Sequence, residues 1–391
     1  FVASIILCFR AIARSCWGSR LLLILASSSF TTALFWIDCT SDTVNNANIC
    51  SDYLMFGINN MLELNHSDIL ALRSALIKAL ESLPLDQSTM ANEGVALSEH
   101  QLLNNQLAEL GLFDLARPQA LEGYTDRHGA IAAVLDELGR KLIPTTLVNT
   151  VTALSLCGST QSLSDQSVLV SSIAAGDSVI ALAGNAECVP YIDDSHTLVV
   201  DESGRISGCV SLVEYGELAT HTLVCIQQKN RAQPTQVFLV EHGQCVKVVK
   251  QKVNDPLGTF SRLEFSHAET QALSDIDQQA IEWAQMSGLC ALAAEQAGAA
   301  QAIFDVTIEY LKTRYQFGRA VGSFQAVKHM VADLLVELES SKSAVIAATT
   351  ALDRQLPDMK RAVHLAAFTC ADVFREISAQ AIQLHGGIAY T

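Results

Sequence analysis

Apolar residues recur at intervals of three and four over the part of the chain between residues 61 and 164. That spacing is typical of helices that bury one face. Three helices are expected there, over residues 69–80, 102–110 and 130–142, with helix-ending residues close behind them at Pro84, Gly111 and Pro144. The segment is therefore predicted to fold as a small N-terminal helical bundle.

The period of the apolar positions changes to two between residues 165 and 270. Turn-forming residues, such as those at 201–204, separate neighbouring runs. Six short β-rich runs are expected, over residues 178–182, 196–200, 223–226, 237–240, 245–249 and 262–265. Since no helical pattern lies between them, this middle domain is predicted to be an antiparallel β barrel or sandwich.

Helical spacing returns in residues 271–391, where helices are expected over 281–314, 325–352 and 361–384. Ala and Gly are dense at 288–302, and a tightly packed seam between helices is expected there because small residues allow close approach. The predicted fold is mainly α with a central β domain. Its parts are an N-terminal helical bundle, an antiparallel β barrel or sandwich, and a C-terminal helical bundle.

Residues 1–60 differ from the rest of the chain. Three arginines precede an apolar run at residues 21–37, whose length is at the lower edge of a membrane span. We interpret the segment as an atypical leader that is not native to the protein, because the chain begins with Phe1 and Met61 stands just before the first clean helical pattern. A membrane anchor or targeting peptide and a genuine domain are the alternatives.

Composition narrows the class of protein. Lys and Arg total 25 against 41 Asp and Glu, and a formal charge of −16 argues against nucleic-acid binding, which needs a basic face. Half of the residues are apolar, so a large core is expected rather than disorder. The eleven cysteines are scattered, without C-x-x-C pairs or histidines at ligand spacing. We interpret them as reduced thiols, with no metal site, and therefore expect a cytoplasmic protein.

Three local features of the last third suggest a nucleotide site. They are residues 313–319 at a helix end, residues 321–325 at the next helix start, and residues 383–387 at the end of the last helix. No G-x-G-x-x-G follows a strand, so a Rossmann site is excluded.

The residue types in these features suit a dinucleotide. The fork of Arg314 can donate two parallel hydrogen bonds to a phosphate. Ser323 is expected to cap a helix start whose exposed amides favour an anion. Gly386 and Gly387 allow the backbone to approach a ligand closely. Taken singly, each residue has an ordinary structural alternative: Arg314 as a cap of its own helix or the partner of a carboxylate, the glycines as helix ends, and His385 as a packed or surface histidine.

The order and spacing of these residues resemble the acyl-CoA dehydrogenase family over roughly residues 62–391. The family segment R-x-x-F-G-x-x-x-x-x-x-Q is matched by Arg314, Phe317, Gly318 and Gln325, and the later Q-x-x-G-G by Gln383, Gly386 and Gly387. The resemblance implies FAD as cofactor, with its ADP half bound across a subunit interface in a homo- or hetero-oligomer. The cofactor-binding residues expected on this basis are Arg314, Phe317, Ser323, Gln325, Gln383, Gly386 and Gly387.

The resemblance also implies a reaction, the α,β-dehydrogenation of an acyl-CoA thioester in fatty-acid or steroid side-chain oxidation. Electron-transfer flavoprotein is the implied electron acceptor. Such chemistry needs a carboxylate that removes the α-proton while FAD takes a hydride from the β-carbon.

Two departures from the family pattern bear on that activity. Residues 181–188 stand in place of A-L-T-E-P-x-x-G-S-D, and the hydroxyl and amide pattern that would hold the flavin ring and the acyl thioester is missing there. Residues 212–215 stand where W-I-T-N is expected. The base is the second departure. It lies in most members beyond Q-x-x-G-G, and in some at a position that aligns with Gly288, whereas Glu282 and Glu295 lie six residues before and seven after it. No catalytic residue is assigned.

Three functions stay open on the sequence, beside an acyl-CoA oxidase or flavin monooxygenase that shares the scaffold. The first is a FAD-dependent acyl-CoA dehydrogenase. The second is a complementing subunit of a heteromeric acyl-CoA dehydrogenase, which supplies ADP contacts to a partner chain. The third is a helical assembly protein without enzymatic activity.

Overall fold

The computed structural model describes residues 20–26, 32–38, 66–81, 95–117, 127–158, 163–184, 198–227, 235–255, 257–273 and 276–390. The chain divides into two compact units, Phe1–Asp68 and Ile69–Thr391. In the first unit, β1 (Arg20–Ala26) pairs antiparallel with β2 (Thr32–Asp38). The apolar run at 21–37 therefore contains two paired strands, while the rest of the expected leader, with Met61, lies outside the described residues.

The N-terminal part of the second unit is helical, as predicted. The expected helices correspond to α3 (His66–Glu81), α5 (Leu97–Glu109) and α6 (Arg127–Arg140). The pattern did not indicate α7 (Leu147–Cys157), which is buried on nearly all sides and so shows no amphipathic stripe, or α8 (Leu163–Ala174). A short 3-10 helix, η2, covers Phe113–Ala116.

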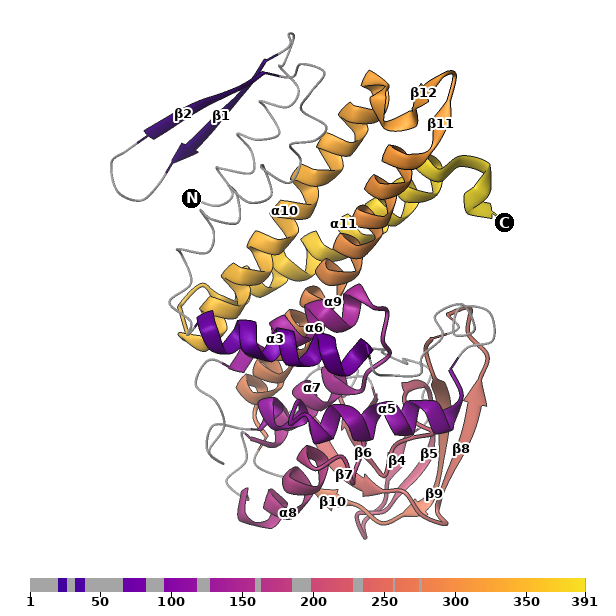
Figure 1. Cartoon of the computed structure of the whole chain (residues 1–391). Coiled ribbons are helices and arrows are strands. Elements are labelled where there is room, and N and C mark those ends of the chain that lie inside the picture. Colours follow the sequence, from indigo (N-terminus) through magenta and orange to yellow (C-terminus); the bar gives the residue numbers. More distant parts are fainter. Residues whose placement is uncertain are drawn as a thin grey trace. The chain divides into compact units, whose positions relative to one another are not determined.

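The middle β segment is a sandwich of two four-stranded sheets (Figure 1). One sheet has the order β10-β7-β6-β3, with β3 Ile180–Gly184, β6 His221–Ile226, β7 Gln236–Glu241 and β10 Gln271–Ala272. The other has the order β4-β5-β9-β8, with β4 Val199–Val200, β5 Ile206–Glu214, β8 Val246–Gln251 and β9 Phe260–Ala268. The sandwich confirms the predicted architecture with one difference. Strands β3 and β6 are parallel, because the chain passes through the other sheet between them.

Alternate residues of the first sheet face two different cores. In β3, Ala181 and Ala183 belong to the core between the sheets, whereas Ile180 and Leu182 belong to the core shared with the helices. This strand is buried on both faces, which explains why it reads as an uninterrupted apolar run. The helices and the sandwich are therefore joined through one hydrophobic core.

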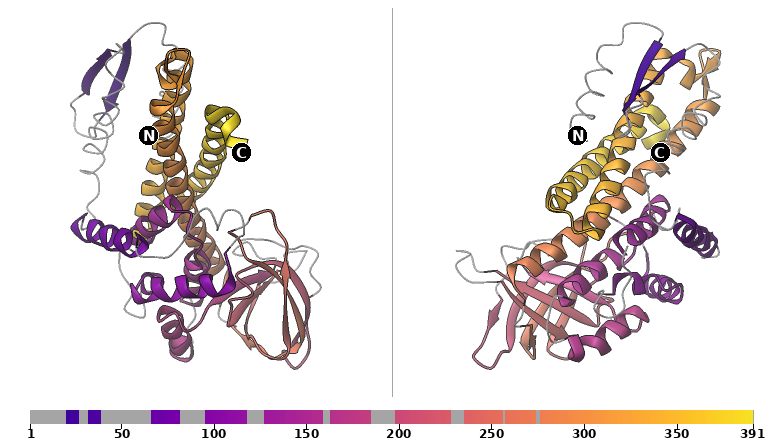
Figure 2. Two further views of the ribbon diagram at one scale, coloured as in Figure 1. Left: turned by 45° about the vertical axis from the view of Figure 1, so that its right-hand side comes forward. Right: turned by 90° about the vertical axis from the view of Figure 1, so that its left-hand side faces the viewer.

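Three long helices form the C-terminal part, as predicted. They are α9 (Gln278–Thr313), α10 (Gln325–Asp353) and α11 (Met359–His385), which run side by side in both views of Figure 2. Asp277 caps α9, and its Oδ1 accepts a hydrogen bond from the Ala280 amide at 2.8 Å. None of the described helices is long and apolar enough to cross a membrane.

The small residues of α9 form the expected seam. A Cβ on Gly298 would collide with the backbone oxygen of Asp136 in α6, and one on Gly139 of α6 would collide with the backbone oxygen of Glu295. A Cβ on Gly288 would collide with the Thr152 hydroxyl of α7. Glycine is required at 139 and 298 because the two helices touch there through backbone, whereas the neighbour of Gly288 is a side-chain hydroxyl.

Candidate functional site

The first candidate feature is a tight hairpin that follows α9. Strands β11 (Tyr315–Gln316) and β12 (Arg319–Ala320) pair around Phe317 and Gly318, whose φ angles are 53° and 78°. Two positive φ angles at the centre of a two-residue loop define a type I′ turn, which matches the twist of the strands. The turn holds the Phe317 side chain in solvent, with 92% of its surface exposed.

Arg314 is the C-cap residue of α9 through its backbone, whose amide donates to the carbonyl of Tyr310 at 2.8 Å. Its side chain is exposed, and within the described residues its guanidinium forms no ion pair or hydrogen bond. Pairing with a carboxylate, the structural alternative for this residue, is therefore not found. Arg319 differs, because its guanidinium carbon stacks 3.9 Å from the centroid of the Phe324 ring.

Ser323 does not cap α10 as the sequence suggested. A 3-10 turn, η4 (Val321–Ser323), intervenes, and the Ser323 hydroxyl donates to the carbonyl of Ala320 at 2.6 Å. Phe324 is the N-cap residue instead, and it provides no side-chain hydrogen bond. The first amides of α10, beginning at exposed Gln325, are thus left without a capping side chain.

The end of α11 is held by aromatic packing. The ring of Tyr310 stacks on that of His385 at 4.4 Å, and the Tyr310 hydroxyl donates to the His385 carbonyl at 3.2 Å. The Nδ1 atom of His385 lies 2.8 Å from the Ala381 carbonyl, so His385 is a packed histidine. Gly386 then adopts a φ of 67°, and neither Gly386 nor Gly387 has an atom within 4 Å of a Cβ position.

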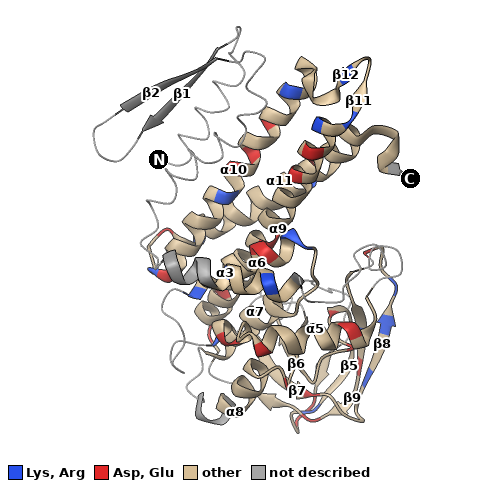
Figure 3. Cartoon of the chain, in the orientation of Figure 1, with Lys and Arg blue, Asp and Glu red and all other residues tan. Residues whose placement is uncertain are grey.

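These features meet at one end of the three-helix bundle. Figure 1 shows the β11–β12 hairpin and the end of α11 at the same end, and the contact of Tyr310 with His385 joins them. Basic residues mark the hairpin in Figure 3. Except for partly buried Ser323, the cofactor-binding residues predicted from the sequence are exposed, Gln383 of α11 among them. The fold therefore places the predicted residues on one open surface at the end of the bundle.

A second feature lies at the end of β5, where the family pattern predicts the W-I-T-N segment. The pairing of β5 with β9 shifts register between Val210 and Val213. Leu212 and Tyr215 have φ angles of 57° and 56°, a conformation that non-glycine residues rarely adopt. Such a bulge re-aims side chains, and here Glu214 points among the helices.

Glu214 lies near α7 and α9. The Asn149 amide of α7 donates to its carboxylate at 3.3 Å. Burial raises the pKa of Glu214 to about 7, with a smaller contribution from the charge of Asp255. Burial likewise raises the pKa of Glu295 on α9 to about 7, and the charge of Glu214 adds to the effect. The sequence analysis noted Glu295 only because it lies seven residues after the base position that aligns with Gly288. It gave no indication of Glu214.

The other two positions considered for the catalytic base do not hold a buried carboxylate. Glu282 is partly exposed and forms an ion pair with Lys360 at 3.2 Å. Gly288 carries no side chain, and the Thr152 hydroxyl fills the space beside it. A base at the position that aligns with Gly288 is therefore ruled out by packing.

A buried Ser-His-Asp arrangement was missed by sequence reasoning, because its members lie far apart in the chain. His128 contacts Asp353 through Nδ1 at 2.7 Å and Ser287 through Nε2 at 3.1 Å. Asp353 also accepts hydrogen bonds from the amides of His128 and Gly129 at 3.0 Å, which caps the start of α6. All three side chains are at most 5% exposed, so the arrangement ties α6, α9 and α10 together and is closed to a substrate.

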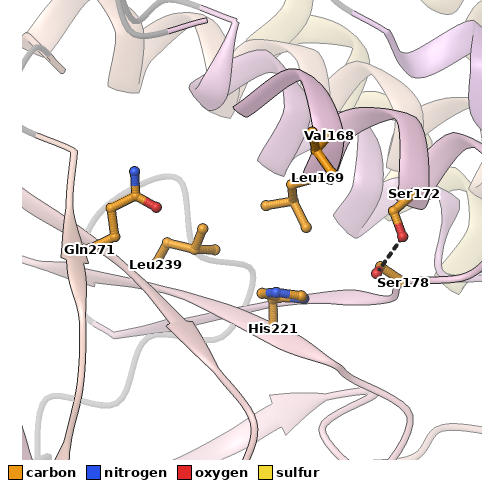
Figure 4. Close-up of a pocket in the computed structure, with 7 residues that line it drawn as sticks. All are labelled: Val168, Leu169, Ser172, Ser178, His221, Leu239 and Gln271. Atoms are coloured by element: carbon orange, nitrogen blue, oxygen red, sulfur yellow. Dashed lines mark hydrogen bonds between the residues drawn. The ribbon is translucent and has the colours of Figure 1, made fainter. Parts of the chain in front are cut away.

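Figure 4 shows a separate pocket of about 300 Å³ between α8 and the first sheet. Ser172 and Ser178 share a hydrogen bond of 2.8 Å at one side, and the His221 ring lies beneath them. Burial lowers the pKa of His221, so this histidine is neutral at pH 7. The pocket is lined by Val168, Leu169, Ser172, Ser178, His221, Leu239 and Gln271. With neither a carboxylate nor a fixed cation in its lining, it is a poor candidate for the predicted chemistry.

The comparisons with known proteins agree with this fold. Residues 280–391 match the C-terminal domain of acyl-CoA dehydrogenases. The chain is 30% identical to the acyl-CoA dehydrogenase IpdE2 of Mycobacterium tuberculosis over 283 residues, which are 72% of this chain and 74% of that protein. The chain therefore belongs to the acyl-CoA dehydrogenase family, whose members are flavin-dependent oxidoreductases.

Solved structures show the same fold. The chain is similar to a variant of the "Tcur3481-Tcur3483 steroid ACAD", with a TM-score of 0.70 and 25% identity, over 83% of this chain and 88% of that one. It is also similar to the ChsE4-ChsE5 complex from Mycobacterium tuberculosis, with a TM-score of 0.68 and 22% identity, over 83% of this chain and 87% of that one.

Proposed function

We propose that this chain is a FAD-dependent acyl-CoA dehydrogenase that oxidises the α,β bond of a CoA thioester. The observation that carries the proposal is the open surface at the end of the three-helix bundle. There Arg314 has no carboxylate partner among the described residues, Gln325 begins an uncapped helix, and Gly386 presents bare backbone. A cation, free amides and accessible backbone are what a pyrophosphate needs.

The surface fits the ADP half of FAD. Arg314 would donate to the pyrophosphate, and the first amides of α10 would add positive potential. Gln325 and Gln383 would provide polar contacts, Ser323 would keep the turn before α10 in place, and Phe317 would cover the nucleotide. When bound, FAD supplies the hydride acceptor of the reaction.

We infer that the chain works as an oligomer. Each predicted contact with ADP, apart from Ser323, is exposed on this chain, and Phe317 projects almost wholly into solvent. A dinucleotide bound on such a surface would stay hydrated on one side unless a second chain covers it. A homo- or hetero-oligomer that shares FAD between subunits fits this exposure.

The reaction partners follow from the family. The substrate would be an acyl-CoA, and the similarity to a steroid ACAD makes ring-bearing acyl groups candidates beside straight chains. Electron-transfer flavoprotein would take the electrons onward, and we place the protein in the cytoplasm.

The proposal is tested by replacing Arg314 in the purified chain and titrating FAD by its visible absorbance. We expect Arg314→Ala to weaken FAD binding by roughly 10- to 100-fold, because a charge-assisted contact with phosphate is lost. Arg361→Ala is the matched control, since Arg361 is an exposed arginine of the same bundle that pairs with Asp358 at 3.1 Å. Equal FAD affinity in both variants would contradict the proposed site.

A complementing subunit of a heteromeric acyl-CoA dehydrogenase is the second candidate. The observation in its favour is the end of β5, where Glu214 replaces the hydroxyl and amide groups of a full flavin-ring site. In that case the lone chain would stay colourless with FAD and would gain flavin only when mixed with a paralogous partner. Stoichiometric flavin and turnover in the lone chain would exclude it.

A further inference from the structure

The pocket between α8 and the first sheet is a cavity that the proposed dehydrogenation does not use. It has a volume of about 300 Å³, and its lining comes from α8, β6, β7 and β10, with Ser178 from the turn before β3 (Figure 4). That volume is at the lower end of the range of small-molecule sites. The chain therefore has room for one small ligand on elements other than those that carry the predicted FAD contacts.

The register of the strands brings together the residues on the sheet side of the pocket. Leu239 of β7 pairs with Gln271 of β10 on one side and with Leu223 of β6 on the other. His221 precedes Leu223 by two residues, so both side chains lie on the same face of the sheet. Ile180, which pairs with His221, belongs to the core that this face shares with the helices. His221 is thus a polar residue on a face that otherwise packs apolar side chains against helices.

One nitrogen of His221 is available to a ligand. Nδ1 lies 3.0 Å from the Thr220 hydroxyl, whereas Nε2 has no hydrogen-bond partner among the described residues. Figure 4 shows the ring between Leu239 and Ser178. Burial lowers the pKa of His221, although the charge of Glu241 acts in the opposite direction, so the ring is neutral at pH 7. A neutral imidazole presents at Nε2 either a lone pair or an N–H, depending on its tautomer.

The helix side of the pocket has a spare hydroxyl proton. Ser172 and Ser178, which we call the serine pair, are joined by a hydrogen bond of 2.8 Å. That bond uses the proton of one hydroxyl, and the proton of the other has no acceptor within the part of the chain that the structure describes. Both side chains are half-buried. The serine pair and His221 therefore leave one hydrogen bond each for a ligand to complete.

The rest of the lining is mainly apolar. Leu169 and Leu239 are partly buried and pack against the shared core, while Val168 is 77% exposed at the rim. No Lys, Arg, Asp or Glu is among the described residues that line the pocket. An ion that entered would lose water without gaining a counter-charge, and such a loss is costly. The lining therefore favours an uncharged ligand with an apolar body.

We propose that this pocket binds a small uncharged molecule that carries a hydroxyl group on an apolar body, with His221 and the serine pair as its polar contacts. A hydroxyl both donates and accepts, so it can pair with Nε2 in either tautomer and can accept the spare serine proton. Leu169, Leu239 and Val168 would cover the apolar body. The site requires neither FAD nor a CoA thioester, so it is independent of the proposed function.

Three probes of similar size test the proposal on the full chain: 4-methylphenol, toluene and 4-methylbenzoate. Titrations are followed by the methyl chemical shifts of ¹³C-labelled leucine, in which Leu169 and Leu239 report both the place and the affinity of binding. We expect 4-methylphenol to shift both residues and to bind about three- to tenfold more tightly than toluene, because it gains the hydrogen bond. The 4-methylbenzoate anion should bind more weakly than either. Equal affinities for 4-methylphenol and toluene would overturn the proposal.

A variant of the histidine tests the polar contact. His221→Leu has a similar volume and should weaken 4-methylphenol binding by about three- to tenfold while leaving toluene binding unchanged. His267→Leu is the matched control, since His267 is an exposed histidine of β9, 3.8 Å from Asp201 and outside the pocket lining. Folding of both variants is verified by circular dichroism.

Two further results would contradict the site. The first is a folded His221→Leu variant that binds 4-methylphenol as tightly as the unmodified chain does. The second is an unmodified chain in which 4-methylphenol at about 10 mM leaves the Leu169 and Leu239 shifts unchanged, because even a weak small-molecule site would be partly filled at that concentration. Neither result would affect the proposed function, which is judged by FAD binding.

Discussion

At Glu295 the surroundings of one side chain determine its ionisation. The same glutamate on the exposed face of α9 would titrate near the usual 4.5, but burial between α6, α7 and β5 raises its pKa to about 7. Burial costs free energy mainly for the ionised carboxylate, because few hydrogen bonds replace the water that it loses. This one residue therefore links the stability of the protein to pH.

Glu295→Gln is expected to stabilise the protein at high pH. Because the folded-state pKa lies above the unfolded value, the stabilising contribution of the protonated carboxyl is fully present below about pH 4.5 and is lost as the pH rises through about 7. Removing the charge should raise the free energy of unfolding by roughly 1–3 kcal/mol at pH 8 and change it little at pH 5. Urea denaturation at the two pH values measures this. An equal effect at both would contradict the burial of the charge.

Tyr310 is expected to control FAD affinity without touching the nucleotide. Its ring and hydroxyl hold His385, and thereby the turn at Gly386. Tyr310→Phe keeps the stack and should weaken FAD binding by about threefold, whereas Tyr310→Leu loses both contacts and should weaken it by about tenfold. Fluorescence titration of FAD gives the affinities. A fall in melting temperature without any loss of affinity would show that Tyr310 only supports the bundle.

At the scale of elements, helix α9 organises the whole C-terminal part. It packs against α6, α7, α10 and α11, and it does so through glycine where another backbone comes closest. At some of these glycines the neighbouring atoms belong to backbone, and at others they belong to a side chain. Gly298 faces a backbone oxygen of Asp136, which cannot move alone, whereas Gly288 faces the side chain of Thr152. The two sites should therefore respond differently to an added methyl group.

Gly298→Ala is expected to destabilise the protein by about 1–3 kcal/mol, because the α6–α9 pair must separate to admit the methyl group. Gly288→Ala should destabilise it as well, and Thr152→Ala in the same chain should restore part of the loss. Thermal denaturation followed by circular dichroism compares the variants, with Gly243→Ala as control because its Cβ position is open. A failure of Thr152→Ala to rescue would show that the clash lies elsewhere.

At the scale of the molecule, the proposed nucleotide surface and the interior carboxylates differ in how far this chain encloses them. The surface at the end of the bundle is mostly exposed, and its Arg314 guanidinium forms no ion pair or hydrogen bond within the described part of this chain. The interior carboxylates Glu214 and Glu295 are partly buried among segments of the same chain, and the Asn149 amide of α7 donates to Glu214 at 3.3 Å. Both observations fit an oligomer in which the nucleotide surface of one copy contacts the FAD of its neighbour, while the interior carboxylates of each copy lie within that copy.

FAD affinity is accordingly expected to depend on the protein concentration. Dilution that separates the subunits should release FAD, since the ADP contacts of one copy would serve its neighbour. Analytical ultracentrifugation with detection at the flavin absorbance measures both the assembly and the bound cofactor. A monomer that retains its FAD would contradict a shared site.

Local periodicity was enough to predict most of the elements. The long helices α9, α10 and α11 follow from apolar residues at helical spacing, and the sandwich from short alternating runs. Strand β5 was not expected, because its Ser and Gly residues interrupt the alternation. The capping role expected for Ser323 was wrong, because the 3-10 turn η4 intervenes and the Ser323 hydroxyl donates to the Ala320 carbonyl within that turn instead.

The sequence by itself determined the class of fold, the family and the set of residues expected to bind ADP, because these depend on local spacing and on motifs such as the one at Arg314. Only the tertiary structure decided that these residues share one end of the bundle and that Glu214 and Glu295 share one interior site. The physical reason is that proximity and burial arise from packing between segments far apart in the chain. A pKa near 7 is a property of that packing, and no local pattern encodes it.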